Sequence, residues 1–342
     1  MSLFVTLLFS GCKQTKEAKT DRLFKPYSGK NVPGAALMII KDGKPVVVKA
    51  YGMANLEKHI PVTPKTDFRL ASVTKQFTAM CIMQLVEKGK LTYQTTLKEI
   101  FPAFPDYGKE ITIRNILHHT SGLLAYEDLV PDTARVQVLD KDVLHLMMKV
   151  DSTYFKPGSR YRYSNTGYAV LAMVVEKVSG KRFAEYLKDN IFAPLKMDHT
   201  VAYEKGISTV PQRAFGYTVT DSGVKFSDQS AYSAVLGDGG IYSNLEDLFK
   251  WDQALYTDKL VSEQTLKTAF TPFKENYGYG WRIDQYKGHR RYHHTGSTSG
   301  FRNVIQRFPD DHFTVIILTN RSEPGVQPLA EKLVDWYLLN EN

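Results

Sequence analysis

Apolar residues along this chain form two kinds of pattern, short strand-like runs near both ends and helical patterns between them. Near the start, "GAALMII" and "PVVVKAYG" flank "KDGK". An Asp-Gly step between apolar runs predicts a hairpin, because glycine accepts positive φ. Near the end, "NVIQRF" and "FTVIILTN" surround "PDDH" in the same way. An isolated two-stranded ribbon is marginal in water, so we expect the two hairpins to join in one sheet.

The middle of the chain has mostly helical periodicity. Gly89 and Gly180 stand where glycine commonly ends a helix. The pattern predicts an α+β fold, with an antiparallel sheet built from both chain ends, flanking helices, and a mainly helical lobe inserted at roughly 65–235. A crevice between the lobes is the natural place for a site. The expected helices span residues 72–88, 142–150, 168–178, 183–190 and 246–256, with a last one from about Val326 to Leu338.

Composition indicates a folded protein. The chain has 342 residues, 43% hydrophobic and 23% charged, enough apolar material for one or two globular domains. The net charge is +8, but lysines and arginines alternate with acids and form no dense run. We therefore expect no nucleic-acid partner.

The first twelve residues, "MSLFVTLLFSGC", form a short apolar run. A helix needs roughly 20 apolar residues to span a bilayer, but a shorter run fits a secretory signal. The stretch "LFSGC" resembles a bacterial lipobox, in which Cys12 would carry lipid. Residues 13–29 would then be a tether and 30–342 the folded domain, placed at the bacterial cell envelope and facing the periplasm or the exterior. The alternative is an ordinary buried strand.

Ser72 and Lys75 stand three residues apart where an apolar helix begins. Serine there is a common helix cap, and the lysine could simply be solvated. However, the following stretch to Val86 is apolar nearly all round, so it reads as a buried helix. Residues three apart share a face, and a desolvated lysine amine can accept a serine proton. The same spacing at Ser10 and at Ser222 lacks this setting.

Three motifs in order identify a resemblance: "SVTK" at 72–75, "YSN" at 163–165 and "HTG" at 294–296. The flanks "TIRNILHHTSGL", "FKPGSRYRYSNTGYAVL", "IFAPLKMDHT" and "YGYGW" are also similar. Over roughly 30–340 the chain resembles the serine β-lactamase and penicillin-binding superfamily, in the branch of class C β-lactamases, DD-carboxypeptidases and related esterases.

The resemblance implies a role for each motif residue. Ser72 would be the nucleophile, Lys75 its base or proton relay, and Tyr163 the second proton-transfer group. From the residues alone Tyr163 is as readily a packing aromatic. Asn165 would donate its amide to the substrate carbonyl, although an Asn before Thr-Gly is often a turn residue. His294 would be a further catalytic residue. It stands where class C β-lactamases have lysine, and a histidine there is more similar to DD-peptidases and esterases.

The "HTG" stretch would be an edge strand that lines the crevice. Thr295, Gly296 and Ser297 would contact substrate, and glycine would allow its backbone to approach closely. The oxyanion hole would be formed by the backbone N–H groups of Ser72 and Ser297.

Several other polar residues have a simpler interpretation. His118 and His119 lack a companion ligand set for a metal, so we expect them to structure a loop. The "GDGG" stretch at 237–240 reads as a turn, and Asp238 is unusual there for the resembled family. Arg282 and Arg302 are candidates for binding a substrate carboxylate, although surface arginines are common.

We therefore expect a serine hydrolase that forms an acyl-enzyme on peptide, amide or ester substrates, most similar to a D-alanyl-D-alanine carboxypeptidase or a related peptidase or esterase. A class C-type β-lactamase and a penicillin-binding sensor without rapid turnover are the alternatives. We expect no metal or organic cofactor, and a monomer attached to the membrane only through its lipid. An α/β-hydrolase is disfavoured, because no Gly-x-Ser-x-Gly occurs.

Overall fold

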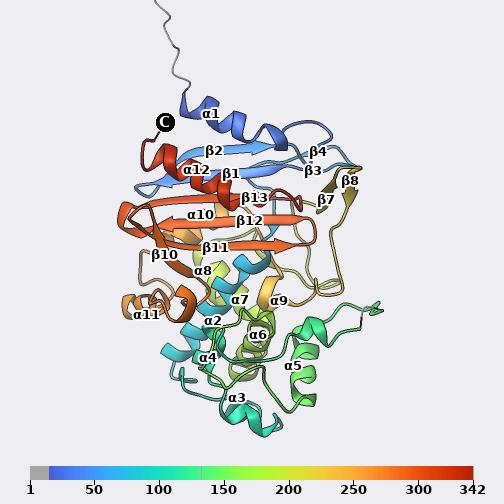
Figure 1. Cartoon of the computed structure of the whole chain (residues 1–342), viewed down its shortest axis with the longest axis vertical. Helices are drawn as coiled ribbons and strands as arrows, with labels where there is room; N and C mark the ends of the chain where they lie inside the picture. The colour runs from blue at the N-terminus through green and yellow to red at the C-terminus, as the bar shows by residue number, and fades with distance from the viewer. Residues whose placement is uncertain (1–14, 132, 342) are drawn as a thin grey trace, which may run out of the picture.

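A six-stranded antiparallel sheet is the central element of the computed structural model, which describes residues 15–131 and 133–341 (Figure 1). Cys12 lies outside these ranges, so its lipidation stays a prediction. The first hairpin pairs with the last one through β1 and β13, which confirms a sheet built from both chain ends. In spatial order the strands are β10 (Arg282–Tyr286), β11 (His289–Thr298), β12 (Phe301–Phe308), β13 (Phe313–Thr319), β1 (Ala35–Lys41) and β2 (Lys44–Tyr51).

The central strands of the sheet are buried on both faces, as β1 illustrates. Successive side chains of a strand point to opposite faces. Met38 and Ile40 enter the large core shared with the helical part, whereas Leu37 and Ile39 enter a second core under α12 (Gln327–Tyr337). Figure 1 shows α12 and α1 (Lys16–Leu23) on the side of the sheet away from the other helices.

Two long helices form the centre of the helical part, α2 (Lys75–Glu87) and α6 (Asn165–Ser179). Both are apolar on nearly every side, and both are largely buried. Gly180 ends α6 with φ of 73°, as its position predicts. The remaining helices are α3 (Leu97–Ile100), α4 (Ile113–Leu117), α5 (Asp140–Lys149), α7 (Phe183–Leu187), α8 (Ala193–Leu195), α9 (Leu236–Gly239), α10 (Leu245–Ala254) and α11 (Glu263–Ala269).

Short strands tie distant parts of the chain together. A three-stranded sheet in the order β5-β9-β6 brings the stretch before α2 beside the stretch after α9. Among the residues that the structure describes, no helix combines the length and apolar character needed to cross a membrane. The short strands are β3 (Met53–Asn55), β4 (Ile60–Pro61), β5 (Phe68–Arg69), β6 (Val201–Ala202), β7 (Tyr217–Thr220), β8 (Gly223–Phe226) and β9 (Ile241–Ser243).

Three local predictions are wrong. Ser72 is not the first residue of the α-helix: it lies in a 3₁₀ turn (Ala71–Thr74), and α2 begins at Lys75. The first three residues of the "GDGG" stretch belong to the short helix α9, which Gly240 caps. Asp140 accepts the backbone N–H groups of Leu236 and Gly237 at the start of this helix.

The "HTG" strand β11 is also not an edge strand, since β10 pairs with it. However, β10 covers only His289–His293. The part of β11 that carries the motif extends beyond the end of β10.

Candidate active site

Ser72 is held at the junction between a strained turn and a buried helix. Ala71, just before it, has a positive φ of 50°, a conformation that a residue with a side chain adopts only at an energetic cost. Ser72 itself is half-buried, and the N-terminal end of α2 follows directly. The partial positive charge at that end favours an anion formed at the serine.

Lys75 is completely buried, and its ammonium donates to three oxygens. Its Nζ lies 3.0 Å from Ser72 Oγ, 2.9 Å from Asn165 Oδ1 and 2.9 Å from the backbone oxygen of Asp238. The same nitrogen lies 4.9 Å from the ring centre of Tyr163. The structure thus brings together Ser72, Lys75, Tyr163 and Asn165, as the sequence predicts.

The "YSN" residues are placed by the start of α6. Ser164 caps this helix by accepting the N–H of Gly167 at 3.0 Å, and its own N–H donates to His119 Nδ1 at 3.1 Å. The two bonds fix the residues on either side of Ser164. The Tyr163 hydroxyl is buried and finds no hydrogen-bond partner among the residues that the structure describes. A buried polar atom without a partner is uncommon in folded proteins and marks a place where a ligand or water can bind.

The "HTG" residues are placed by close packing of β11 on the turn that carries the serine. A Cβ atom on Gly296 would stand 2.1 Å from the backbone oxygen of Leu70. Only glycine fits there. The next residue, Ser297, is exposed and lines the same cavity as Ser72.

His294 is buried, and both of its ring nitrogens are engaged. Nδ1 donates to the backbone oxygen of Thr295 at 2.7 Å, which leaves Nε2 to accept from the Tyr277 hydroxyl at 3.0 Å. Burial, reinforced by the charge of Lys75, holds the pKa of His294 well below its usual range. The histidine is therefore neutral, and the catalytic role expected for it stays a prediction.

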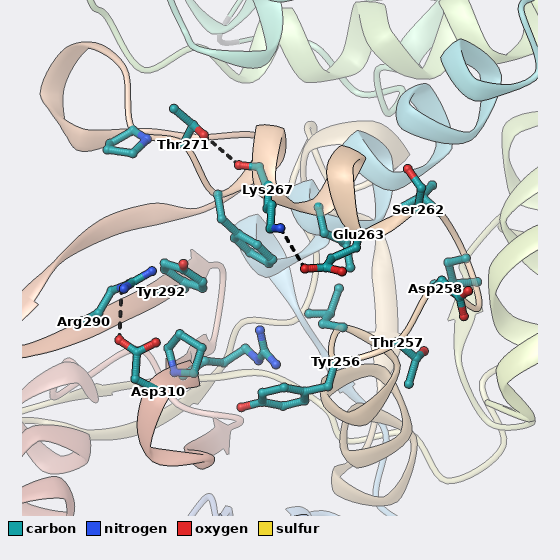
Figure 2. Close-up of a pocket in the computed structure, with 18 of the residues that line it drawn as sticks. Tyr256, Thr257, Asp258, Ser262, Glu263, Lys267, Thr271, Arg290, Tyr292 and Asp310 are labelled. Carbon is teal, nitrogen blue, oxygen red and sulfur yellow. Dashed lines mark hydrogen bonds and ion pairs between the residues drawn. The ribbon is translucent and has the colours of Figure 1, made fainter.

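The cavity in front of Ser72 has a volume of about 310 Å³. A larger hollow, with a volume of about 1130 Å³, is shown in Figure 2. It is surrounded by α11, the segment before α11 and the β11 end of the sheet. None of the motif residues lines that larger hollow. Chemistry rather than size therefore identifies the small cavity as the candidate site.

Two carboxylates line this cavity that no motif predicts. Glu127 accepts the amide of Asn165 at 2.8 Å, and Asp238 accepts the hydroxyl of Tyr126 at 3.2 Å. Burial raises the pKa of Asp238 to about 6 against the opposing charge of Lys75, and the charge of Glu127 adds to the rise. The unusual aspartate in "GDGG" was the one sequence feature that pointed here, whereas nothing in "AYED" singles out the glutamate.

The two histidines of "HHTSG" structure the surroundings, as expected. His118 Nδ1 donates to the backbone oxygen of Tyr277 at 2.9 Å, and burial lowers the pKa of this histidine to about 4. His119 packs on Tyr163 with ring centres 4.3 Å apart. Within the described ranges no group of three or more His, Cys, Asp or Glu side chains is placed to hold a metal ion.

The two candidate arginines differ. Arg302 donates to the backbone oxygens of Thr298 and Phe301, so it holds the turn after β11. Arg282 makes no ion pair with the residues described here, and its guanidinium lies 5.9 Å from the ring centre of Tyr163. Of these two arginines, Arg302 pairs with Glu323, whereas Arg282 has no ion-pair partner in the described part of the chain.

Comparisons with known proteins agree with this arrangement. The model of the Beta-lactamase family matches residues 20–336. The chain is 33% identical to penicillin-binding protein 4* of Bacillus subtilis, over 91% of this chain and 73% of that protein. A solved penicillin-binding protein of Bacillus halodurans is 30% identical with a TM-score of 0.79, covering 96% of this chain and 99% of that one.

A third similar protein is the octameric penicillin-binding protein homologue of Pyrococcus abyssi. It is 28% identical with a TM-score of 0.85, and the alignment covers 96% of this chain and 78% of that one. Motifs, geometry and similarity over nearly the whole length agree. The chain belongs to the Beta-lactamase family, within the superfamily of serine β-lactamases and penicillin-binding proteins.

Proposed function

We propose that this protein is a hydrolase that forms an acyl-enzyme on Ser72, with an activity similar to a DD-carboxypeptidase or a related peptidase or esterase. One observation carries the proposal. The nitrogen of the completely buried Lys75, the first residue of α2, lies 3.0 Å from the oxygen of Ser72. Ser72 lines a cavity. A serine on a solvated surface would have no such partner.

The contacts suggest how the reaction proceeds. Once the Lys75 amine has a free lone pair, it takes the proton of Ser72 Oγ, and the oxygen attacks the substrate carbonyl carbon. The oxyanion is stabilised by the backbone N–H groups of Ser72 and Ser297 and by the end of α2. The leaving amine or alcohol receives a proton through Lys75 and the unpartnered Tyr163 hydroxyl. Water then attacks the acyl-enzyme, releases the acid and returns the proton to Ser72.

Arg282 supports a peptidase that recognises a free carboxylate. Its guanidinium lies beside Tyr163 and is not neutralised by an ion pair in the described part of the chain. Arginine binds carboxylates through paired hydrogen bonds. A peptide with a terminal carboxylate would place that group toward Arg282 while its last amide bond reaches Ser72.

The test is intact-protein mass spectrometry on the protein and on its Ser72→Ala variant. Each is incubated with a fluorescent penicillin, a fluorophosphonate, a peptide ending in D-Ala-D-Ala and a short-chain ester. We expect fluorophosphonate labelling of Ser72 and turnover of the peptide or the ester. Both should be lost in the variant.

The other outcomes separate the alternatives. Rapid hydrolysis of penicillin would favour a class C-type β-lactamase. A stable penicillin adduct without turnover of peptide or ester would favour a sensor that traps its ligand. Labelling or turnover that persists in Ser72→Ala would overturn the proposal.

We also propose that Cys12 carries a lipid that anchors the protein at the bacterial cell envelope. The lipobox-like sequence supports this. Fractionation of cells that produce the full chain, with Cys12→Ser as the control, would test it. The expected monomer also stays a prediction, and light scattering on purified protein decides between it and an assembly like that of the octameric homologue.

A further inference from the structure

The cavity in front of Ser72 offers unused hydrogen-bond acceptors. Glu127 uses one carboxylate oxygen to accept from Asn165, and Asp238 uses one to accept from Tyr126. The second oxygen of each carboxylate has no hydrogen-bond partner among residues 15–131 and 133–341. Neither acid takes part in an ion pair within those ranges. Both residues line the cavity.

The two cations near these acids direct their hydrogen bonds mainly to other groups. Lys75 directs its ammonium to Ser72, Asn165 and the backbone oxygen of Asp238. Arg69 also lines the cavity, but it donates to the backbone oxygens of Gly239 and Ser233 at 3.2 and 2.7 Å, and the nitrogen that remains is fully buried. Both positive charges offset part of the negative charge, yet neither cation donates to the Glu127 or Asp238 carboxylate within the described ranges.

Hydrogen bonds link both acids to the nucleophile through other residues. A chain of hydrogen bonds connects Glu127 to Asn165, Asn165 to Lys75 and Lys75 to Ser72, with lengths of 2.8, 2.9 and 3.0 Å. Asp238 joins the same chain through its backbone oxygen. Ser72 and both acids line one cavity of about 310 Å³, so a group next to the scissile carbonyl of a substrate can reach the two carboxylates.

The complementary group is a small cation that can donate several hydrogen bonds. An ammonium has three donors and no acceptor, which matches two free carboxylate oxygens. Hydrogen bonds between charged partners are the stronger kind, and they gain further in a site shielded from water. A neutral amide or an acyl chain in the same place would leave the carboxylates desolvated without a partner.

We propose that Glu127 and Asp238 select substrates that carry a protonated amine next to the scissile carbonyl, such as an aminoacyl amide, aminoacyl ester or a peptide with a free N-terminus. This inference rests on the proposed function and narrows it, because a peptide whose penultimate residue is acylated would place a neutral amide against the two carboxylates. Arg282 does not line this cavity, so a carboxylate on the leaving side and an amine on the acyl side are compatible.

A purely structural role for the two acids predicts a different result. Asp238 would then only hold Tyr126 in place, and Glu127 would only orient the amide of Asn165. Removing either charge would weaken reactions with all substrates equally. The ratio between an amine-bearing substrate and its N-acetyl counterpart separates the two roles, because it cancels any general damage to the site.

The experiment compares D-alanine p-nitroanilide with its N-acetyl derivative, and the corresponding pair of p-nitrophenyl esters. The ratio of their kcat/KM values defines the amine preference. It is measured for the unaltered protein, for Glu127→Gln and for Asp238→Asn. Each substitution keeps an oxygen that can accept the observed hydrogen bond while it removes the charge. Glu263→Gln is the control, because this acid lies in the larger hollow of Figure 2.

We expect the unaltered protein to prefer the free amine by about tenfold or more, and each substitution to reduce that preference about tenfold. Glu263→Gln should leave it unchanged. A preference for the N-acetyl substrates would overturn the inference. So would an amine preference that survives both substitutions, or equal losses on both members of a pair.

Binding to Ser72→Ala separates this inference from the proposed function. Calorimetry on this variant compares D-alaninamide with N-acetyl-D-alaninamide and needs no chemistry. Suppose that a fluorophosphonate does not label the unaltered protein, yet Ser72→Ala binds the free amine more tightly. The hydrolase proposal then fails, whereas the proposed amine selection by Glu127 and Asp238 stands. If labelling and turnover occur but Ser72→Ala binds both amides equally, the hydrolase stands and this inference fails.

Discussion

Replacing Lys75 with methionine tests the base directly. Methionine has a similar length and an apolar end, so Lys75→Met fills the buried space but provides no amine. A positioned general base contributes about 10²- to 10⁴-fold to a rate. We therefore expect the rate at which a fluorophosphonate labels Ser72 to fall at least about 100-fold, which corresponds to about 2.7 kcal/mol.

The same change has a cost in stability that the contacts allow us to assess. The amide oxygen of Asn165 and the backbone oxygen of Asp238 each lose the donor they have now. A buried acceptor left without a donor costs about 1–3 kcal/mol. Removal of the buried ammonium itself offsets part of this loss, because its desolvation no longer has to be compensated. The net loss should be about 2–4 kcal/mol, and the melting temperature should fall by several degrees.

Lys267→Met provides the matched control. This lysine lies on α11, its side chain is 66% exposed, and it pairs with Glu263 at 2.8 Å (Figure 2). An exposed pair of this kind contributes about 0.5 kcal/mol at most, so neither labelling nor melting should change appreciably.

The assay follows the mass of the intact protein during labelling, and calorimetry gives the melting temperature. If Lys75→Met folds cooperatively and labels within about threefold of the unaltered rate, Lys75 is not the base. The mechanism proposed for Ser72 would then be wrong even if Ser72 remained the labelled residue.

Three further outcomes follow from the contacts. Tyr163→Phe removes a hydroxyl that has no partner in the described residues, so the melting temperature should hold or rise. Turnover should fall at least about tenfold, because the hydroxyl is proposed to transfer a proton. A large loss of stability with retained kcat would contradict this expectation. Gly296→Ala places a Cβ 2.1 Å from the backbone oxygen of Leu70, so both the melting temperature and the rate of Ser72 labelling should fall. Gly325→Ala is the control, because the space around Gly325 is open. Equal melting temperatures of the two variants would refute the close packing at Gly296. Burial raises the pKa of Asp238 to about 6 from an ordinary value of 3.8, so the folded state binds the proton more tightly and this carboxyl makes stability fall as pH rises from about 4 to 6. Asp238→Asn should therefore become progressively more stable than the unaltered protein across that interval in melting experiments, and a constant difference would show that the carboxyl does not titrate there.

Sequence periodicity predicted the parts of this fold that depend on local pattern. The glycine at the end of α6 and the pairing of both chain ends in one sheet follow from spacing and turn chemistry. The start of α2 was missed, because a 3₁₀ turn and the first turn of an α-helix share the same spacing of apolar residues. Strand order at β10 was missed because periodicity does not show which strand pairs with which.

In the candidate site, too, the local contacts could be predicted from the sequence, whereas the contacts between distant segments could not. Ser72 and Lys75 belong to one local segment, so their three-residue spacing is enough to place them together. The other two oxygens that Lys75 contacts belong to Asn165 and Asp238, which lie 90 and 163 positions further along the chain. Motif order could indicate Asn165 through resemblance. The Asp238 contact uses a backbone oxygen, and a backbone oxygen leaves no mark in a sequence.

This dependence on distant segments explains why the sequence did not show that Glu127 and Asp238 lie together, although it indicated the nucleophile and marked Asp238 as unusual. Glu127 reaches the site only because its loop lies against the start of α6, and Asp238 only because α9 packs against the turn that carries Ser72. The reactive pair is therefore built within one segment, whereas the groups that surround it come from segments that only the complete fold brings together. A local motif can then fix the reaction class while the distant segments determine which substrate the same serine accepts. This is why the proposed preference for an amine rests on the contacts of Glu127 and Asp238 rather than on any motif.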